Sequence, residues 1–326
     1  MKKVLIMLAA AVIVLFPAVP ALSEEEPQPK VFGGLKQNVE VVVDTFGFPH
    51  IYAATEADAL FALGYMHARN RLWQMDFNRR AAQGRLAEIL GESAVEHDTF
   101  IRTIGLNRMA EQSARRIKED PKLYRLFNAY VWGINSYIAE VMADGLPIEF
   151  LELQYEPEPW KIQDSLAIGK AMSWELCGSM DDLYMGTLVE KLGVETVNEL
   201  FPFDRYKEVP IIPPEEYEVE SEANAASTAS PELPSVPAGI AEASHLVLKQ
   251  FAGCSRILGK YKNIGSNNWV ISGNKSAGGA PILASDPHLG FNMPSVWYVA
   301  HIVGGPLNVL GVTLPGLPIV TIGHNR

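Results

Sequence analysis

The spacing of apolar and polar positions changes along this chain, from mostly helical in the first two hundred residues to strand-like near the end. The run VEVVVDTFGFPHIYA, residues 39–53, is rich in β-branched and aromatic residues and predicts two short strands joined by a turn at Phe46-Gly47. Thr55, with Asp58 three residues later, has the form of a helix-capping box. Apolar residues then recur at roughly helical spacing, which predicts an arginine-rich helix across residues 62–91.

Further helices are predicted at residues 120–143, 163–192, 194–200 and 240–258. Residues 209–239 carry many Pro, Glu, Ala and Ser residues and little to bury, which predicts a mobile linker. Beyond Ser266, four apolar runs punctuated by Gly, Pro and Asn predict strands buried in a sheet: NNWVISG, PILASDPHLG, SVWYVAHIVG and LNVLGVTLPG. The predicted fold class is therefore α+β, helical first and β-rich later.

The first residues have the layout of a secretory signal peptide. Lys2 and Lys3 precede an apolar run from Val4 to Phe16, and small residues follow it. The run is short for a bilayer span, although an uncleaved anchor has the same general pattern. We therefore expect residues 1–23 to be removed on export to the periplasm or the outside of the cell, with no stable membrane span afterwards.

Charge and cysteine content exclude some classes of protein. Acidic residues outnumber basic ones, 38 to 27, and the formal charge is −11, which argues against a nucleic-acid partner because phosphate binding needs a basic surface. Cys177 and Cys254 are the only cysteines. They could pair after export, but they form neither a disulfide framework nor a metal-ligand pattern.

Several common catalytic motifs are missing from the sequence. It contains no G-x-S-x-G elbow, no H-E-x-x-H zinc helix and neither of the common glycine-rich phosphate loops. A standard serine triad is therefore not supported. The feature of chemical interest that remains is the peptide bond between Gly265 and Ser266, where the linker part ends and the β-rich part begins.

The Gly265-Ser266 bond has two interpretations. Locally, Gly-Ser-Asn-Asn is an ordinary turn sequence. Alternatively, the Ser266 hydroxyl attacks the Gly265 carbonyl where the backbone is strained, and water cuts the resulting ester; glycine leaves room for this attack and permits unusual dihedral angles. The new chain then begins with a serine whose α-amino group, with an ordinary pKa of about 7.7 to 8.0, can act as the base for its own hydroxyl.

The ordered motifs of the chain resemble those of the penicillin acylase family of N-terminal-nucleophile hydrolases. The matching stretches are PHIYA, DALFALGYMHARNRLWQMDFNRRAAQGRLAEILG, GSNNWV, DPHLG, LPGLPIV and GHN. The resemblance implies an exported precursor with an α chain at residues 24–208, an excised spacer at 209–265 and a β chain starting at 266–326, the two chains forming a heterodimer. It implies that the β chain begins an αββα sandwich, and we expect the sequence to be the front part of a longer protein.

The resemblance also assigns roles to individual residues. It makes Ser266 the nucleophile, Gly265 the residue before the cut, and Lys275 an aid to self-cleavage. The alternative for Lys275 is an ordinary surface lysine in a turn. It places the backbone amide of His288 beside the oxyanion and its side chain beside the Ser266 amine; the alternative is a loop histidine. The implied reaction is attack of the Ser266 hydroxyl on the carbonyl of a small-molecule N-acyl amide, followed by hydrolysis of the acyl-enzyme.

The resemblance implies no organic cofactor but allows a calcium ion. Asp182 falls near a calcium ligand of related acylases, and its carboxylate suits that cation, although adjacent Asp residues near a helix start also serve as caps.

The positions that line the phenylacetyl pocket of penicillin G acylases are all aliphatic here, which suits an alkyl chain at least as well as an aryl group. Ordinary core packing gives the same residue types. The positions are Met172, Leu176, Leu289, Val296 and Ile322.

Other functions stay open from the sequence. The substrate could be an acyl-homoserine lactone, which keeps the enzyme class and changes the leaving group. The chain could instead be an exported binding module, in which case the Gly265-Ser266 bond stays intact. A metal site of Asp286, His288 and His301 is a further alternative, but its spacing matches no established ligand pattern.

Overall fold

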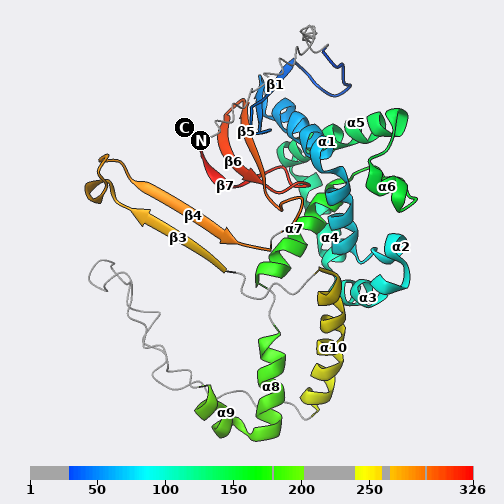
Figure 1. The fold of residues 1–326 in the computed structure, drawn as a ribbon, viewed down its shortest axis with the longest axis vertical. Helices are drawn as coiled ribbons and strands as arrows, with labels where there is room; N and C mark the ends of the chain where they lie inside the picture. The colour runs from blue at the N-terminus through cyan, green and yellow to red at the C-terminus, as the bar shows by residue number, and fades with distance from the viewer. Residues whose placement is uncertain (1–28, 178–179, 202–238, 259–264, 291, 326) are drawn as a thin grey trace, which may run out of the picture. The chain divides into compact units, whose positions relative to one another are not determined.

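The structure is a computed structural model that describes residues 29–177, 180–201, 239–258, 265–290 and 292–325 (Figure 1). The predicted signal peptide, most of the predicted linker and the residues directly before Gly265 lie outside the described residues. The side chains of Cys177 and Cys254 lie outside them as well, so the pairing of the two cysteines stays a prediction.

Helices dominate the chain before residue 259 and strands dominate it after residue 264, which confirms the predicted α+β class. The first part contains β1 (Val39–Val43), β2 (Pro49–Ala53), α1 (Glu56–Gln83), α2 (Ala87–Leu90), the 3-10 helix η1 (Gly91–Ala94), α3 (Val95–Ile104), α4 (Leu106–Glu119), α5 (Pro121–Asp144), α6 (Ile148–Glu152), α7 (Ile162–Cys177), α8 (Asp181–Leu192), α9 (Val194–Leu200) and α10 (Ile240–Leu258). The last part contains β3 (Gly265–Ile271), the 3-10 helix η4 (Gly273–Lys275), β4 (Ile282–His288), β5 (Tyr298–Gly304), β6 (Leu307–Thr313) and β7 (Val320–Asn325).

The first hairpin and the start of the first long helix are confirmed. β1 and β2 pair in antiparallel register, and the Thr55 hydroxyl accepts the backbone N–H of Asp58 at 3.1 Å, as an N-cap does. The Asp58 carboxylate accepts the backbone N–H of Lys36, 2.9 Å away, and so ties the chain before β1 to the helix start. The predicted helical extent to residue 91 is wrong, because α1 ends at Gly84, whose φ of 66° is left-handed.

A five-stranded sheet joins residues before the predicted cut to residues after it. Its order is β1-β2-β5-β6-β7, and every pair is antiparallel except β2 with β5. In that parallel pair Ile51 lies opposite Ile302, and both side chains are buried. A parallel pair needs a long crossover connection, which the intervening helices supply here.

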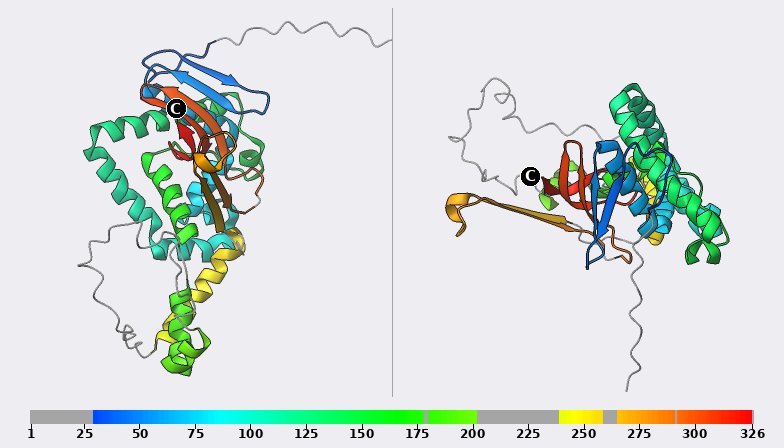
Figure 2. Two further views of the ribbon diagram at one scale, coloured as in Figure 1. Left: turned by 90° about the vertical axis from the view of Figure 1, so that its left-hand side faces the viewer. Right: turned by 90° about the horizontal axis from the view of Figure 1, so that it is seen from above.

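Helix α1 lies on this sheet and packs closely along α5 (Figures 1 and 2). Two glycines allow the close approach of the helices: a Cβ on Gly64 would lie 2.1 Å from the carbonyl oxygen of Tyr130, and one on Gly133 would lie 1.9 Å from that of Phe61. Burial of the apolar side chains between the helices and the sheet is the main stabilising contribution. This core includes Ile51, Leu60, Leu63, Met75, Leu126, Ile134, Ala300 and Ile302.

Strands β3 and β4 form a two-stranded hairpin, paired from Gly265 opposite His288 to Ile271 opposite Ile282. The prediction that these strands are buried is wrong in this structure, since all of β3 and nearly all of β4 are exposed, Trp269 included. An apolar run indicates that a strand has a face to bury, but it does not specify what covers that face.

The predicted helix over residues 163–192 forms as two helices, α7 and α8, and residues 178–179 between them are not described. α10 contacts α8 and α3. Aromatic rings from three helices meet in a small apolar cluster at this junction: Phe100, Trp174 and Phe251, with Ile101, Leu106 and Met180. None of the described helices is both long enough and apolar enough to span a membrane.

Candidate active site

Ser266 is the second residue of β3, at the end of the hairpin away from its turn (Figure 1). The strand register places Gly265 opposite His288 and Ser266 opposite Pro287. In the uncut chain the Ser266 hydroxyl donates a hydrogen bond to the carbonyl oxygen of Gly265, 2.6 Å away. The contact is with the oxygen of the carbonyl group whose carbon the hydroxyl would attack in the predicted self-cleavage.

Gly265 itself has an ordinary extended conformation. It belongs to β3 and is not among the described glycines with positive φ. A Cβ at this position would have no atom within 4 Å. The strained dihedral angles expected from the sequence are not present at this residue.

His288, the last residue of β4, is exposed. Its Nε2 lies 2.8 Å from Oδ2 of Asp286, because residues two apart on a strand point to the same face. A carboxylate only accepts, so Nε2 carries a proton in this contact. The register brings His288 opposite Gly265, next to the predicted nucleophile, whereas its role at the oxyanion stays a prediction.

Lys275 lies at the other end of the hairpin. It is the last residue of η4, between the two strands, and is exposed. Ser266 and Ile271 are five residues apart on β3, which corresponds to about 17 Å at the usual strand rise. The hairpin by itself does not bring the ammonium group to the Gly265-Ser266 bond, so the role of Lys275 in self-cleavage gains no support from this geometry.

The five residues predicted to line the acyl pocket come from three parts of the structure. Met172 and Leu176 are one turn apart on α7, Leu289 and Val296 lie between β4 and β5, and Ile322 lies in β7. Leu176 is exposed and the other four are half-buried. Two cavities among the described residues are lined by other side chains. A pocket formed by these five residues therefore stays a prediction.

The described residues do not assemble a metal site, since they contain no group of three His, Cys, Asp or Glu side chains that could hold an ion. Asp182 lies exposed in the first turn of α8, where a carboxylate stabilises the helix end. One exposed carboxylate is a single ligand of the oxygen-rich shell that calcium needs, so the calcium site stays a prediction and no step is assigned to this ion. His301 lies with His50 in a different sheet from Asp286 and His288, which separates the residues of the alternative metal site.

A buried histidine that the sequence pattern did not single out links the helices to the strands after the predicted cut. His67 of α1 is fully buried, with Nδ1 2.7 Å from the Tyr130 hydroxyl and Nε2 2.8 Å from the Thr313 hydroxyl. Thr313 donates its proton to the Tyr298 carbonyl, and the Tyr130 hydroxyl accepts the backbone N–H of Gly316. Every group is satisfied when Nε2 carries the ring proton and Nδ1 accepts from Tyr130. Burial lowers the pKa of His67 to about 3.

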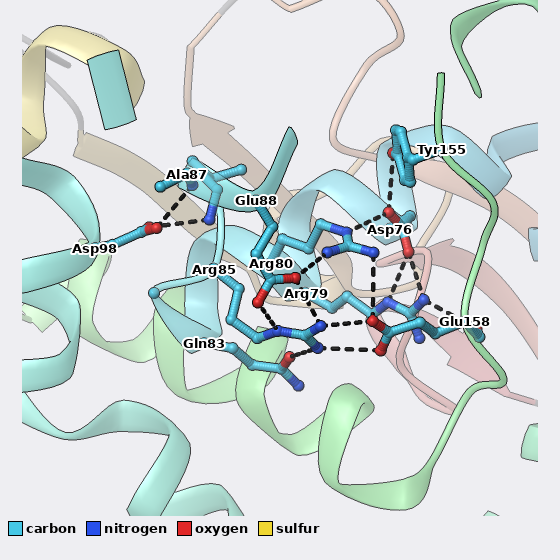
Figure 3. A network of polar contacts seen from close by, with 12 residues as sticks. Asp76, Arg79, Arg80, Gln83, Arg85, Ala87, Glu88, Asp98, Tyr155 and Glu158 are labelled. Carbon is cyan, nitrogen blue, oxygen red and sulfur yellow. Dashed lines mark hydrogen bonds and ion pairs between the residues drawn. The ribbon is translucent and has the colours of Figure 1, made fainter. Parts of the chain in front are cut away.

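A second buried network fixes the end of α1 (Figure 3). Arg79 and Arg80 are buried and both pair with the carboxylate of Asp76, which also accepts a hydrogen bond from Tyr155. Arg79 pairs in addition with Asp164, at 3.2 Å. Two arginines of the predicted arginine-rich helix are therefore partners in internal ion pairs and not surface groups.

This network continues to the surface through Arg85, just after α1 (Figure 3). Arg85 pairs with Glu88 at 2.8 Å and with Glu158 at 2.5 Å. Hydrogen bonds from Arg85 lower the pKa of the Glu158 carboxyl to about 2. In the sequence, these networks could be recognised because polar residues occupy positions where the helical spacing predicts apolar ones.

Comparison with known proteins gives a consistent result across the chain. The family model described as penicillin amidase matches residues 38–326. Acyl-homoserine lactone acylase QuiP of Pseudomonas aeruginosa is 36% identical over 293 residues, which cover 90% of this chain and 32% of that protein. The penicillin acylase 2 proenzyme of Pseudomonas sp. strain SE83 is 34% identical over 286 residues, which cover 87% of this chain and 34% of that protein. The chain thus spans about a third of the length of these relatives.

Among solved structures, the thermostable penicillin G acylase from Alcaligenes faecalis is similar. The sequence identity is 28% and the TM-score is 0.46. The match covers 54% of this chain and 95% of that chain.

Proposed function

The chain belongs to the penicillin amidase family, and from this premise we propose that the protein is an exported amidohydrolase that activates itself by cutting its Gly265-Ser266 bond. Ser266 then hydrolyses an N-acyl amide through an acyl-enzyme. The names of the two relatives, an acyl-homoserine lactone acylase and a penicillin acylase proenzyme, support acylase chemistry, and the second also supports processing of a precursor.

The observation that carries the proposal is the contact of the Ser266 hydroxyl with the Gly265 carbonyl, at 2.6 Å. In self-cleavage Oγ bonds to the carbonyl carbon, the C–N bond breaks, and the nitrogen leaves as the Ser266 amine with the hydroxyl proton. Water then hydrolyses the ester, which leaves a carboxylate on Gly265 and restores the Ser266 hydroxyl. The cut therefore creates the amine that catalysis uses as its base.

In catalysis the amine and the hydroxyl of Ser266 act together. The amine, with an ordinary pKa of about 7.7 to 8.0, takes the hydroxyl proton while Oγ attacks the acyl carbonyl, and returns it to the leaving amine through a water. We assign the backbone N–H of His288 to the developing oxyanion, because the hairpin places His288 opposite Gly265. Water then releases the acid from the acyl-enzyme.

We propose an alkyl acyl group for the substrate. The residues of the predicted pocket are all aliphatic and flexible or branched: Met172, Leu176, Leu289, Val296 and Ile322. An acyl-homoserine lactone is a specific candidate, since the relative with 36% identity is named for that activity.

Export and chain association complete the proposal. Residues 1–23 direct export to the periplasm or beyond and are removed. The two chains made by the cut stay together as a heterodimer, because β2 before the cut pairs with β5 after it.

The substrate proposal is tested by assaying the full-length processed protein with octanoyl homoserine lactone and with penicillin G. We expect faster cleavage of the octanoyl substrate, and cleavage of neither substrate by Ser266→Ala. Phenylacetyl amides cleaved much faster than any fatty acyl amide would contradict the alkyl pocket. Activity that persists in Ser266→Ala would contradict the nucleophile.

A further inference from the structure

Helix α1 is bent near its middle, next to residues that contact the strands after Ser266. Arg71 has a φ of −144° and a ψ of 19°, which are not helical values, while the helix continues on both sides. Neither Pro nor Gly stands at the bend in HARNRLWQ, so neither of these residues causes the kink. Polar side chains around the bend instead reach a single segment, residues 294–298.

Two of these side chains bind backbone carbonyls of that segment. Gln74 Nε2 lies 3.3 Å from the carbonyl oxygen of Pro294 and 3.0 Å from that of Ser295. Arg71 Nη1 lies 3.2 Å from the same Ser295 oxygen. Pro294 and Ser295 lie just before β5, so their carbonyl groups are outside the strand pairs. The side chains of α1 bind these carbonyl groups instead.

Tyr298, the first residue of β5, connects this segment to His67. The Tyr298 hydroxyl accepts a hydrogen bond from Asn70 Nδ2 at 2.8 Å, and the Arg71 guanidinium lies 5.9 Å from the centre of its ring. The His67 ring packs edge-on against the same ring, with centres 4.9 Å apart. The Tyr298 carbonyl accepts from the Thr313 hydroxyl, which accepts from His67 Nε2. Residues 67–74 therefore hold both the 294–298 segment and the end of β6.

One residue of the proposed acyl pocket lies in a part of the chain held in this way, and a second lies on the strand paired with the other part. Val296 is in the middle of the 294–298 segment, and Ile322 of β7 lies opposite Val312, directly before Thr313. We propose that residues 67–74 of α1, the positioning segment, set the spacing of these two side chains and so select the length of the acyl chain. The inference rests on the proposed function, because it concerns the acyl pocket of that reaction.

The expected effect is on selectivity, because these hydrogen bonds fix the backbone position of pocket residues and touch no reacting atom. Ser266 lies on the separate β3–β4 hairpin, so loosening the 294–298 segment leaves self-cleavage intact. A single methylene changes discrimination by about 10- to 200-fold in a fitted hydrophobic pocket. A small displacement of Val296 is therefore enough to change the preferred chain length.

The test uses Gln74→Met in the full-length protein, which removes the Gln74 donor to the Pro294 and Ser295 carbonyls, leaves Arg71 on the Ser295 carbonyl, and keeps a side chain of similar length. We expect a Ser266 N-terminus as in the wild type, and a change of about tenfold or more in the ratio of kcat/KM for octanoyl against butanoyl homoserine lactone. Hydrogen exchange measured by mass spectrometry reports how firmly residues 294–298 are held and does not depend on activity. The backbone amides of residues 295–299 should exchange faster in the variant than in the wild type. Tyr298→Phe, which removes only the acceptor of Asn70, should change both readouts in the same direction.

Arg115→Met is the matched control, because Arg115 is exposed on α4 and pairs with Glu111 on the same helix. It should leave the exchange rates and the substrate ratio unchanged. A Gln74→Met protein with an unchanged ratio overturns the inference, whether or not its exchange is faster, and so does an equal loss on both substrates. A wild-type protein that hydrolyses no acyl amide contradicts the proposed function itself and removes the selectivity claim with it. In that case the exchange data still report whether α1 holds residues 294–298.

Discussion

Tyr130 and Thr313 occupy both ring nitrogens of His67, and this arrangement suits only the neutral ring. A second ring proton would break the hydrogen bond that Tyr130 donates to Nδ1. Burial opposes the charged ring, and Arg71 adds a smaller repulsion, which together lower the pKa of His67 to about 3.

The consequence is acid sensitivity. The unfolded chain takes up a proton on His67 below the ordinary pKa of 6.5 and the folded chain only near pH 3. Stability is therefore lost as the pH falls from 6.5 towards 3, by at most about 1.4 kcal/mol per pH unit. In the uncut Ser266→Ala protein, we predict that His67→Gln reduces the difference between the free energies of unfolding at pH 7.5 and 4.5 by about 2 to 3 kcal/mol, as measured in urea.

His245→Gln is the control for that measurement, because His245 is exposed on α10. It should leave the acid sensitivity of the protein as it was. A His67→Gln protein that loses as much stability between pH 7.5 and 4.5 as the parent would show that His67 is not held neutral in the fold.

Asp76 provides the second prediction at this scale, since it pairs with two buried arginines, Arg79 and Arg80. Asp76→Asn leaves both guanidinium groups without that charge, which typically costs about 3 to 5 kcal/mol in a buried network. Urea unfolding measures this loss. Glu111→Gln, which breaks an exposed pair with Arg115, should cost less than about 1 kcal/mol. Equal effects of the two substitutions would contradict the internal role of Asp76.

At the scale of elements, α10 lies within the predicted spacer, residues 209–265, and still packs against the helices before it. Phe251 of α10 and Phe100 of α3 have ring centres 5.6 Å apart in the apolar cluster at this junction. The α10 contacts therefore stabilise the uncut chain, and excision of the spacer, which the family resemblance implies, would remove them.

We predict that Phe251→Ala lowers the free energy of unfolding of the uncut Ser266→Ala protein by about 1 to 3 kcal/mol, because it removes a partly buried ring. The same substitution should have no effect on the processed enzyme, since the spacer has left. Leu246→Ala, at a side chain 62% exposed on the same helix, serves as the control. A destabilised processed enzyme would show that α10 is retained after the cut.

Local sequence signals were sufficient to place most elements. The cap at Thr55 marked the start of α1, and the predicted ranges 194–200 and 240–258 coincide with α9 and α10. The burial of β3 and β4 was not predictable in the same way, because it depends on what packs against the hairpin and not on the strands themselves. The parallel pairing of β2 with β5 likewise has no local signal in either strand.

The same distinction applies to the candidate site. One hairpin contains Gly265, Ser266 and His288, so the sequences of its two neighbouring strands could predict that these residues lie close together. His67 and Thr313 are 246 residues apart, and no periodicity within α1 specifies a hydroxyl on a distant strand. A polar residue on the apolar face of a helix signals a buried partner without identifying it.

At the scale of the whole molecule, the five-stranded sheet and its core cross the proposed cut. β1 and β2 come from the part before Ser266, and β5, β6 and β7 from the part after it. The core contains Ile51 and Leu63 from the first part and Ala300 and Ile302 from the second. Cutting one exposed bond in the hairpin therefore leaves these contacts in place.

We predict that the two chains of the processed protein elute together in size-exclusion chromatography and separate only in denaturant. The sheet pairing and the shared core account for this association. Elution of two separate species from native buffer would contradict the arrangement of the sheet.

The central claim is that Ser266 becomes the first residue of a new chain, and the N-termini of the purified full-length protein test it most directly. Edman sequencing or mass spectrometry should find a chain that begins Ser-Asn-Asn-Trp, and Ser266→Ala should abolish that cut. Folded wild-type protein with an intact Gly265-Ser266 bond would contradict the account and favour an exported binding module.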